Sequence, residues 1–151
     1  MRVWERAVAT GLGTGYFPVA PATFGSLLGF AFWFLIIPEN TAVRASLIAA
    51  LFFYGVYLCA RLIPEWGDDP RRIVVDEICG MWLVLWLIPG SAWVAVGGFF
   101  VFRVFDVIKP PPIRGLESIP QGWGVMLDDT LAALYSAGFI RLLSLTGHLL
   151  R

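Results

Sequence analysis

The chain has 151 residues, which suits one domain and is short for two, and 58% of them are hydrophobic. Soluble domains hold about 45–50% apolar residues, so this excess indicates a protein of the lipid bilayer. The 11 basic and 11 acidic residues cancel, which argues against nucleic acid as the main partner, because binding a phosphate backbone requires a basic surplus. We therefore treat residues 1–151 as a single membrane-embedded domain.

The N-terminal part is expected to begin with a short amphipathic helix over residues 1–10. Apolar side chains between Val3 and Val8 share one face of this helix, so it is suited to lie on the membrane surface. A loop is expected from Thr10 to Ser26, because its glycines and prolines interrupt regular structure.

About five apolar segments follow, and each is expected to form a membrane-crossing helix. They are Leu27 to Ile37, Ala45 to Ile63, the two arms of the run from Ile78 to Phe102, and Val125 to Ile140. Pro38 and Pro64 are expected to end the first two segments. The predicted fold class is thus all-α, an integral membrane helical bundle with an added N-terminal amphipathic helix.

The run from Ile78 to Phe102 allows two interpretations. A single helix would be about 37 Å long and would span a bilayer alone. Pro89-Gly90-Ser91 is a strong turn signal, however, and favours a hairpin of two short arms. A hairpin puts Asp76, Asp106 and Asp128 on one side of the membrane, whereas a single helix puts Asp76 and Asp106 on opposite sides.

The distribution of basic residues supports the hairpin and predicts its orientation. Under the hairpin, three of the 11 basic residues lie on one side, and the other eight share the acidic side: Arg2, Arg6, Arg61, Arg71, Arg72, Arg103, Lys109 and Arg114. Basic residues concentrate on the cytoplasmic side of membrane proteins. The acidic side is therefore expected to face the cytoplasm.

Five carboxylates at the ends of apolar segments are the candidate metal ligands: Asp76, Glu77, Asp106, Asp128 and Asp129. Charged groups near hydrocarbon are costly and need a partner or a role. Carboxylates that converge repel one another unless a cation neutralises them, and oxygen ligands suit Mg²⁺. We expect them to bind one or two Mg²⁺ ions. The alternative is that each carboxylate only stabilises a helix N-terminus.

Basic and hydroxyl side chains nearby are candidates for binding a phosphate group. Arg103 precedes Asp106 by three residues on one helix, Pro110 places Lys109 at the helix exit, and Arg114 follows in a proline-rich loop. The hydroxyl candidates come from the N-terminal loop: Thr10, Thr14, Thr23 and Ser26. Snorkelling to anionic lipids is the other explanation for Arg114.

Missing motifs narrow the chemistry. The only histidine, His148, lies near the C-terminus and is expected to face away from the acids. Neither cysteine begins a Cys-x5-Arg motif, and no Asp-x-Asp pair is present. Metal-assisted attack of water, or an unusual carboxylate role, remains, and phosphoryl transfer fits because it depends mostly on positioning and charge neutralisation.

These residues stand within a recognisable series of motifs, and the chain resembles the bacterial phosphatidylglycerophosphatase A family. The matching segments occur in the family's order at residues 9–15, 20–27, 75–82, 102–110, 112–114 and 124–129. The resemblance implies a Mg²⁺-dependent, multi-pass phosphatase of the bacterial inner membrane with its site on the cytoplasmic side. It would convert phosphatidylglycerophosphate, a phospholipid substrate in the bilayer, to phosphatidylglycerol and phosphate. The implied catalytic residues are Asp76, Glu77, Asp106, Lys109, Asp128 and Asp129.

The chain departs from the family pattern at four positions, Ala22, Pro111, Glu117 and Trp123, where Gly, Trp, Asp and Gly are usual. These departures leave the acidic residues intact and affect the loops that would touch the headgroup.

Three other functions stay open at the level of sequence. Another metal-dependent phospholipid headgroup enzyme, a CDP-alcohol phosphotransferase, would need an Asp-Gly dipeptide, which the chain lacks. A small membrane cation transporter would place its acids near mid-membrane rather than at segment ends. A scaffold without catalysis is the third.

Overall fold

The computed structural model describes residues 2–67, 71–116 and 118–149, with side chains described up to residue 145, and within these residues every regular element is helical. The elements are α1 (Val3–Ala9), the 3-10 helix η1 (Thr14–Tyr16), α2 (Pro21–Leu35), α3 (Thr41–Trp66), α4 (Val75–Leu87), α5 (Ala92–Ile108), α6 (Ile113–Leu116) and α7 (Trp123–Leu149). The predicted all-α class is confirmed.

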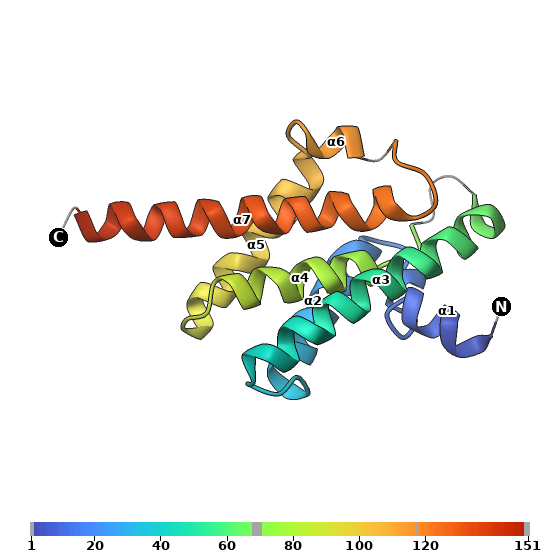
Figure 1. Ribbon diagram of the computed structural model, residues 1–151, viewed down its shortest axis with the longest axis horizontal. Coiled ribbons are helices and arrows are strands. Elements are labelled where there is room, and N and C mark those ends of the chain that lie inside the picture. The colour runs from blue at the N-terminus through green and yellow to red at the C-terminus, as the bar shows by residue number, and fades with distance from the viewer. Residues whose placement is uncertain (1, 68–70, 117, 150–151) are drawn as a thin grey trace.

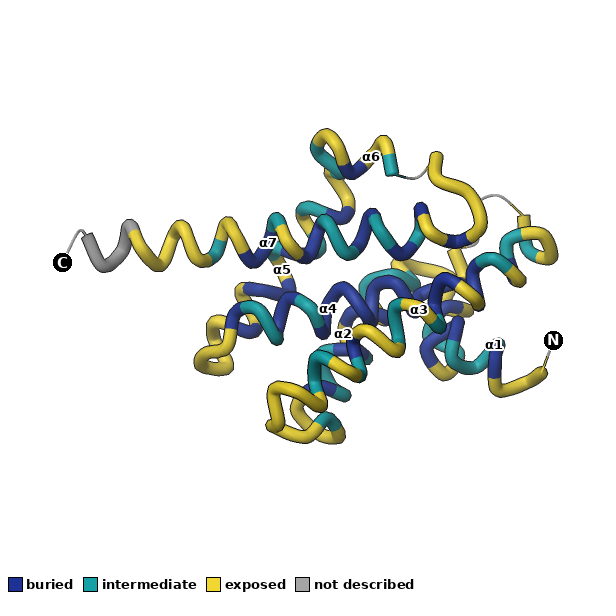
Figure 2. Tube along the Cα trace, viewed as in Figure 1, coloured by how far each residue is buried: buried dark blue, intermediate teal, exposed yellow. Residues whose placement is uncertain are grey.

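Helix α4 forms the centre of the bundle. Helices α2, α3, α5 and α7 all pack against it (Figure 1). Ten of its 13 residues are buried, which is why the tube in Figure 2 is dark over most of α4. The two acidic residues in the first turn of α4 are therefore enclosed by neighbouring helices.

The chain turns back between α4 and α5, as the Pro89-Gly90-Ser91 signal predicts. Helix α4 ends at Leu87 and α5 begins at Ala92. Gly98 allows the two arms to approach, because a Cβ atom there would lie 2.6 Å from the Cδ1 atom of Ile88. The hairpin brings the end of α5 back toward the start of α4.

Two helix boundaries differ from the sequence prediction. Helix α2 begins at Pro21, so the last part of the predicted loop is helical. Proline at the first helical position has its φ angle already suited to a helix and lacks only a donor that would be unpaired there. Helix α3 continues through Pro64 to Trp66, because a proline so near the helix end removes a single hydrogen bond. The prediction that Pro64 ends the helix was wrong.

The C-terminal half also differs in detail. The proline-rich loop contains the single turn α6, and α7 begins at Trp123 and runs to Leu149, well beyond the predicted end at Ile140. The far part of α7 extends past the bundle, and its side chains between residues 138 and 145 are mostly exposed (Figure 2).

Helix α3 is, within the described residues, the one helix both long and apolar enough to cross a bilayer. Its 26 residues correspond to about 39 Å at 1.5 Å per residue. Helix α2 is apolar but shorter. The structure thus supports a helical bundle with one such span, which is fewer than the five crossings expected from the sequence.

Asn40 caps the N-terminus of α3, and this capping can be tested by substitution. The Asn40 side chain accepts a hydrogen bond of 3.0 Å from the Val43 backbone N–H. Replacing Asn40 with alanine should lower the free energy of unfolding by about 1 kcal/mol, because that donor loses its partner. Thermal unfolding in detergent measures the effect, with Asn40→Asp as the control that keeps an acceptor. Equal midpoints for Asn40→Ala and Asn40→Asp would contradict this capping role.

Candidate active site

Three carboxylates meet between α4 and α7. Asp76 and Glu77 come from the first turn of α4, and Asp129 comes from α7. One oxygen from each of the three lies within 4.8 Å of the others, and all three residues are buried. This is close enough for one small ion to contact all three side chains.

Each of these acids also has an oxygen without a hydrogen-bond partner. The atoms are Asp76 Oδ1, Glu77 Oε2 and Asp129 Oδ2, all buried and unpaired among the described residues. Burying a polar atom without a partner is costly, and burying three like charges together costs more. The donor set is all oxygen, which is the set that Mg²⁺ prefers. The residues present therefore fit a divalent cation.

The other two predicted ligands are paired with basic side chains. Asp106 Oδ2 lies 2.8 Å from Arg103 Nη1, and Asp128 Oδ2 lies 2.5 Å from Lys109 Nζ. Asp128 also accepts a hydrogen bond from the Asp129 backbone N–H at 2.9 Å through Oδ1. The structure thus divides the five carboxylates into an acidic trio (Asp76, Glu77 and Asp129) and two ion pairs beside it.

Each of the two basic residues has a further feature that fixes its position. Arg103 Nη1 also donates to the buried hydroxyl of Ser26 on α2, at 3.4 Å. Lys109 is the C-terminal cap of α5, with a left-handed φ of 47°. Two positive groups therefore stand next to the acidic trio, one anchored by α2 and one at the exit of α5.

The remaining phosphate-binding candidates occupy more peripheral places. The Thr10 hydroxyl donates to Arg6 O at 2.8 Å, and the Thr14 hydroxyl donates to Gly11 O at 3.0 Å, so both brace the N-terminal loop. Thr23 is half-buried on α2, and Arg114 is exposed on α6. Of this predicted set, Arg103 forms an ion pair with Asp106, and Ser26 accepts a hydrogen bond from Arg103.

Helix dipoles account for only part of the arrangement. Asp76 and Glu77 lie in the first turn of α4, where a negative charge is favoured. Asp106 lies near the C-terminal end of α5, which is the unfavourable end for a carboxylate. Asp129 lies beyond the first turn of α7. The helix-stabilising alternative therefore explains two of the five acids and does not explain the other three, of which Asp106 and Asp128 are paired with basic side chains and Asp129 belongs to the trio.

Gly80 of α4, which was not among the predicted site residues, allows α5 and α7 to lie close to α4. A Cβ atom at Gly80 would lie 2.6 Å from Cζ of Phe102 and 3.2 Å from the backbone oxygen of Asp129. Gly80 follows Asp76 by one helical turn, so the close approach occurs beside the acidic trio. The glycine is visible in the sequence, but nothing there reveals which helix lies against it.

A second contact fixes the start of α4. The Val74 backbone N–H donates to Ala9 O at 2.9 Å, which ties this helix start to the end of α1. A Cβ atom at Gly15 would lie 2.0 Å from Arg72 O, so the N-terminal loop packs directly on the segment before α4. The loop therefore positions the acidic turn of α4.

Three of the four residues that depart from the family pattern lie within the described part of the chain, and each makes a contact with a nearby residue. Trp123 packs its ring near Phe52 and Phe53, with centroids 6.0 and 6.3 Å away. Pro111 O accepts a hydrogen bond from Tyr135, and Ala22 O accepts one from the Ser26 hydroxyl. Glu117 lies outside the described residues.

Comparison with known proteins identifies the family of the chain. The family model described as phosphatidylglycerophosphatase A matches residues 7–144. Proteins named phosphatidylglycerophosphatase A from Escherichia coli and Haemophilus influenzae are 37% and 39% identical, over 88% and 85% of this chain and 79% and 82% of their own lengths. A Bacteroides thetaiotaomicron protein, provisionally named a phosphatidylinositol-3-phosphatase, is 37% identical over 85% of this chain and 86% of its own. No solved structure matches. The chain therefore belongs to the phosphatidylglycerophosphatase A family of phosphatases.

Proposed function

We propose that the chain hydrolyses the phosphomonoester of phosphatidylglycerophosphate, giving phosphatidylglycerol and phosphate, with Mg²⁺ as its cofactor. Its place would then be in glycerophospholipid biosynthesis. The family assignment supports the reaction, and the acidic trio, with its three unpaired buried oxygens within reach of one ion, supports the metal. That trio is the observation on which the proposal chiefly depends.

The residues divide the work of hydrolysis between them. Asp76, Glu77 and Asp129 would hold the cation, which when bound supplies a Lewis acid for the phosphate oxygens and lowers the pKa of water. Lys109 and Arg103 would bind the phosphate oxygens. Each is the basic member of an ion pair beside the trio, and each can also donate hydrogen bonds to an anionic substrate. Water adds its oxygen to phosphorus, the bond from phosphorus to the glycerol oxygen breaks, and that oxygen takes up a proton.

We also infer that the bundle is multi-pass in the inner membrane, with the acidic trio on the cytoplasmic side. Helices α2, α4 and α5 have 15, 13 and 17 residues, about 20–26 Å at 1.5 Å per residue. Such short helices cross when the bilayer thins locally or when polar ends are buried in protein. The excess of basic residues on the acidic side supports the orientation.

The related Bacteroides protein suggests a second substrate to be tested. Its name refers to a phosphate on an inositol lipid, and its identity to this chain equals that of the Escherichia coli relative. Both lipids carry a phosphomonoester above a diacylglycerol anchor, so the same charge arrangement would serve either.

Phosphate release by the purified protein in detergent tests the proposal. Dioleoyl phosphatidylglycerophosphate should release phosphate with Mg²⁺ present, and a chelator should remove nearly all of that activity until Mg²⁺ is restored, because the trio then lacks its counter-charge. Phosphatidylinositol 3-phosphate serves as the comparison substrate, and faster phosphate release from it than from phosphatidylglycerophosphate would favour the second substrate. Full activity in the chelator would disprove the metal role. Ion flux through liposomes without phosphate release would favour a transporter.

A further inference from the structure

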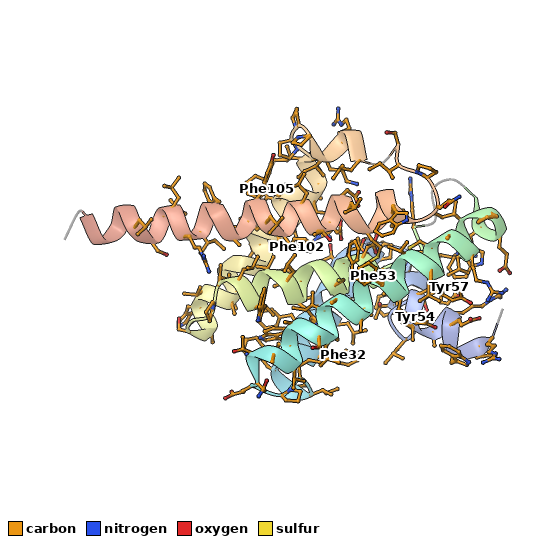
Figure 3. The ribbon with its side chains drawn as sticks, in the orientation of Figure 1. Phe32, Phe53, Tyr54, Tyr57, Phe102 and Phe105 are labelled. Atoms are coloured by element: carbon orange, nitrogen blue, oxygen red, sulfur yellow. The ribbon has the colours of Figure 1, made fainter. Side chains whose placement is uncertain are left out.

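A second polar and aromatic cluster lies where α1 packs against α3, outside the acidic site. Tyr54, Tyr57 and Arg61 recur every three or four residues and so share one stripe of α3. Figure 3 shows both tyrosines on the side of α3 near α1. The stripe that faces the bundle core is a different one, formed by Gly55, Leu58, Cys59 and Leu62. The α1–α3 cluster therefore stands apart from the trio between α4 and α7.

The cluster surrounds an open cavity of about 680 Å³, lined by Arg2, Trp4, Glu5, Tyr54, Tyr57 and Arg61. Its aromatic rings form a nearly parallel row. Trp4 and Tyr54 have centroids 6.0 Å apart at 12°, and Tyr54 and Tyr57 have centroids 5.9 Å apart at 21°. The guanidinium of Arg2 lies over the Trp4 ring, and that of Arg61 lies over the Tyr57 ring.

The Glu5 side chain holds the residues of the cavity together through its hydrogen bonds. It is 4% exposed and accepts hydrogen bonds from the Arg2 backbone N–H at 2.8 Å, from Tyr57 Oη at 3.4 Å and from Arg61 Nη1 at 3.5 Å. The hydrogen bond from the Arg2 backbone lowers the pKa of Glu5, so the side chain is a carboxylate at neutral pH. Its negative charge is therefore taken up by groups that line the cavity.

The remaining polar groups of the cavity are donors. Tyr54 Oη is buried and has no hydrogen-bond partner among the described residues. Arg61 makes both of its contacts to Tyr57 and Glu5 through Nη1, while 48% of its side chain stays exposed. Two arginines against one glutamate leave the lining with one positive charge. A ligand that supplies the missing hydrogen-bond partners of the Tyr54 hydroxyl and the Arg61 guanidinium must carry acceptor oxygens and negative charge.

The surroundings indicate where that anion comes from. Val3 and Trp4 are 87% and 50% exposed on α1, and Leu12 in the following loop is 69% exposed. Such a rim of apolar and aromatic side chains suits the interface between headgroups and acyl chains. An ammonium headgroup does not fit, since guanidinium groups already lie over the Trp4 and Tyr57 rings.

We propose that this cavity binds the phosphate group of an anionic phospholipid at the membrane interface, as a second lipid site separate from the catalytic carboxylates. Arg61 and Arg2 bind the phosphate oxygens, and the Tyr54 hydroxyl donates to one of them. The aromatic row and the exposed side chains of α1 contact the glycerol and the first methylenes. The bound lipid holds α1 on the membrane surface.

Lipid binding to the full chain in detergent, followed by native mass spectrometry without Mg²⁺, tests the site independently of any activity. The probe is dioleoyl phosphatidylglycerol. Arg61→Gln should weaken its binding about tenfold, because a charge-assisted hydrogen bond is lost. Tyr54→Phe keeps the ring and should weaken binding by a smaller factor. Arg72→Gln is the matched control, since Arg72 also lies over a tyrosine ring, that of Tyr16, outside the cavity.

Several results would overturn the proposal. Unchanged affinity in Arg61→Gln, with its unfolding temperature also unchanged, would show that the cavity does not hold the lipid. An equal loss in Arg72→Gln would show a general effect of surface charge. Dioleoyl phosphatidylcholine binding as tightly would show adsorption of acyl chains. Glycerol 3-phosphate binding as tightly would make this a site for free phosphate esters.

Discussion

Replacing Asp129 with asparagine is expected to slow phosphate release by a hundredfold or more, since even indirect partners of a metal ligand contribute about 10–100-fold. Asp129 supplies one of the three buried oxygens that lie within 4.8 Å of one another, and it is the member contributed by α7. An amide is a neutral and weaker ligand, so the site would hold its cation poorly. Phosphate release at several Mg²⁺ concentrations measures the loss.

The same variant should respond to Mg²⁺ differently in thermal unfolding, which makes the test independent of turnover. Without metal, Asp129→Asn should unfold at a higher temperature than the unchanged protein, because one of three clustered negative charges is gone. Mg²⁺ should raise the unfolding temperature of the unchanged protein and leave that of the variant nearly constant. Glu39→Gln, at an exposed carboxylate, is the control that should behave like the unchanged protein. A normal Mg²⁺ response in Asp129→Asn would remove the trio from metal binding.

Replacing Gly80 with alanine is expected to lower both activity and stability although no catalytic group is touched. The new methyl carbon would lie 2.6 Å from the Phe102 ring on α5 and 3.2 Å from the Asp129 backbone oxygen on α7, so the Phe102 ring must move and α7 must shift by a few tenths of an ångström. Overpacking of this kind costs about 1–3 kcal/mol. The shift of α7 moves Asp129 relative to Asp76 and Glu77, and we expect activity to fall at least about tenfold, since small misplacements near chemistry are costly.

Gly97→Ala is the matched control for this prediction. Gly97 lies within α5, and no atom lies within 4 Å of a Cβ built there. Alanine is the better helix former by about 1 kcal/mol, so this variant should be equally or more stable and fully active. If Gly80→Ala also kept full activity and its unfolding temperature, the close packing of α4 on α7 would not control the acidic trio.

The two proline signals in the chain had different outcomes, and the difference has a physical cause. Pro89-Gly90-Ser91 is a run of residues that all disfavour a helix, and the chain breaks there as predicted. Pro64 is an isolated proline two residues before a helix end, and α3 continues through it. Local propensity decides where several residues agree, whereas one proline, which removes a single hydrogen bond, does not end a helix by itself.

The site shows a similar division. Motif positions and charge placement were enough to name Asp76, Glu77, Asp106, Asp128 and Asp129 as a group. They were not enough to separate the trio from the pairs Arg103–Asp106 and Lys109–Asp128, since partners across helices depend on how those helices rotate and approach. Spacing along the chain relates side chains only within one helix.

By itself, the sequence determined that the chain is helical and apolar, that it turns at Pro89-Gly90, and that its acids stand at segment ends beside basic residues. Composition and periodicity act over a few residues, so they are readable without a fold. Only the tertiary structure decided that Asp129 reaches Asp76 and Glu77, that Gly80 permits it, and that Glu5 gathers Tyr57 and Arg61 into a second cavity. These contacts join residues far apart in the chain, and close packing of whole helices selects them.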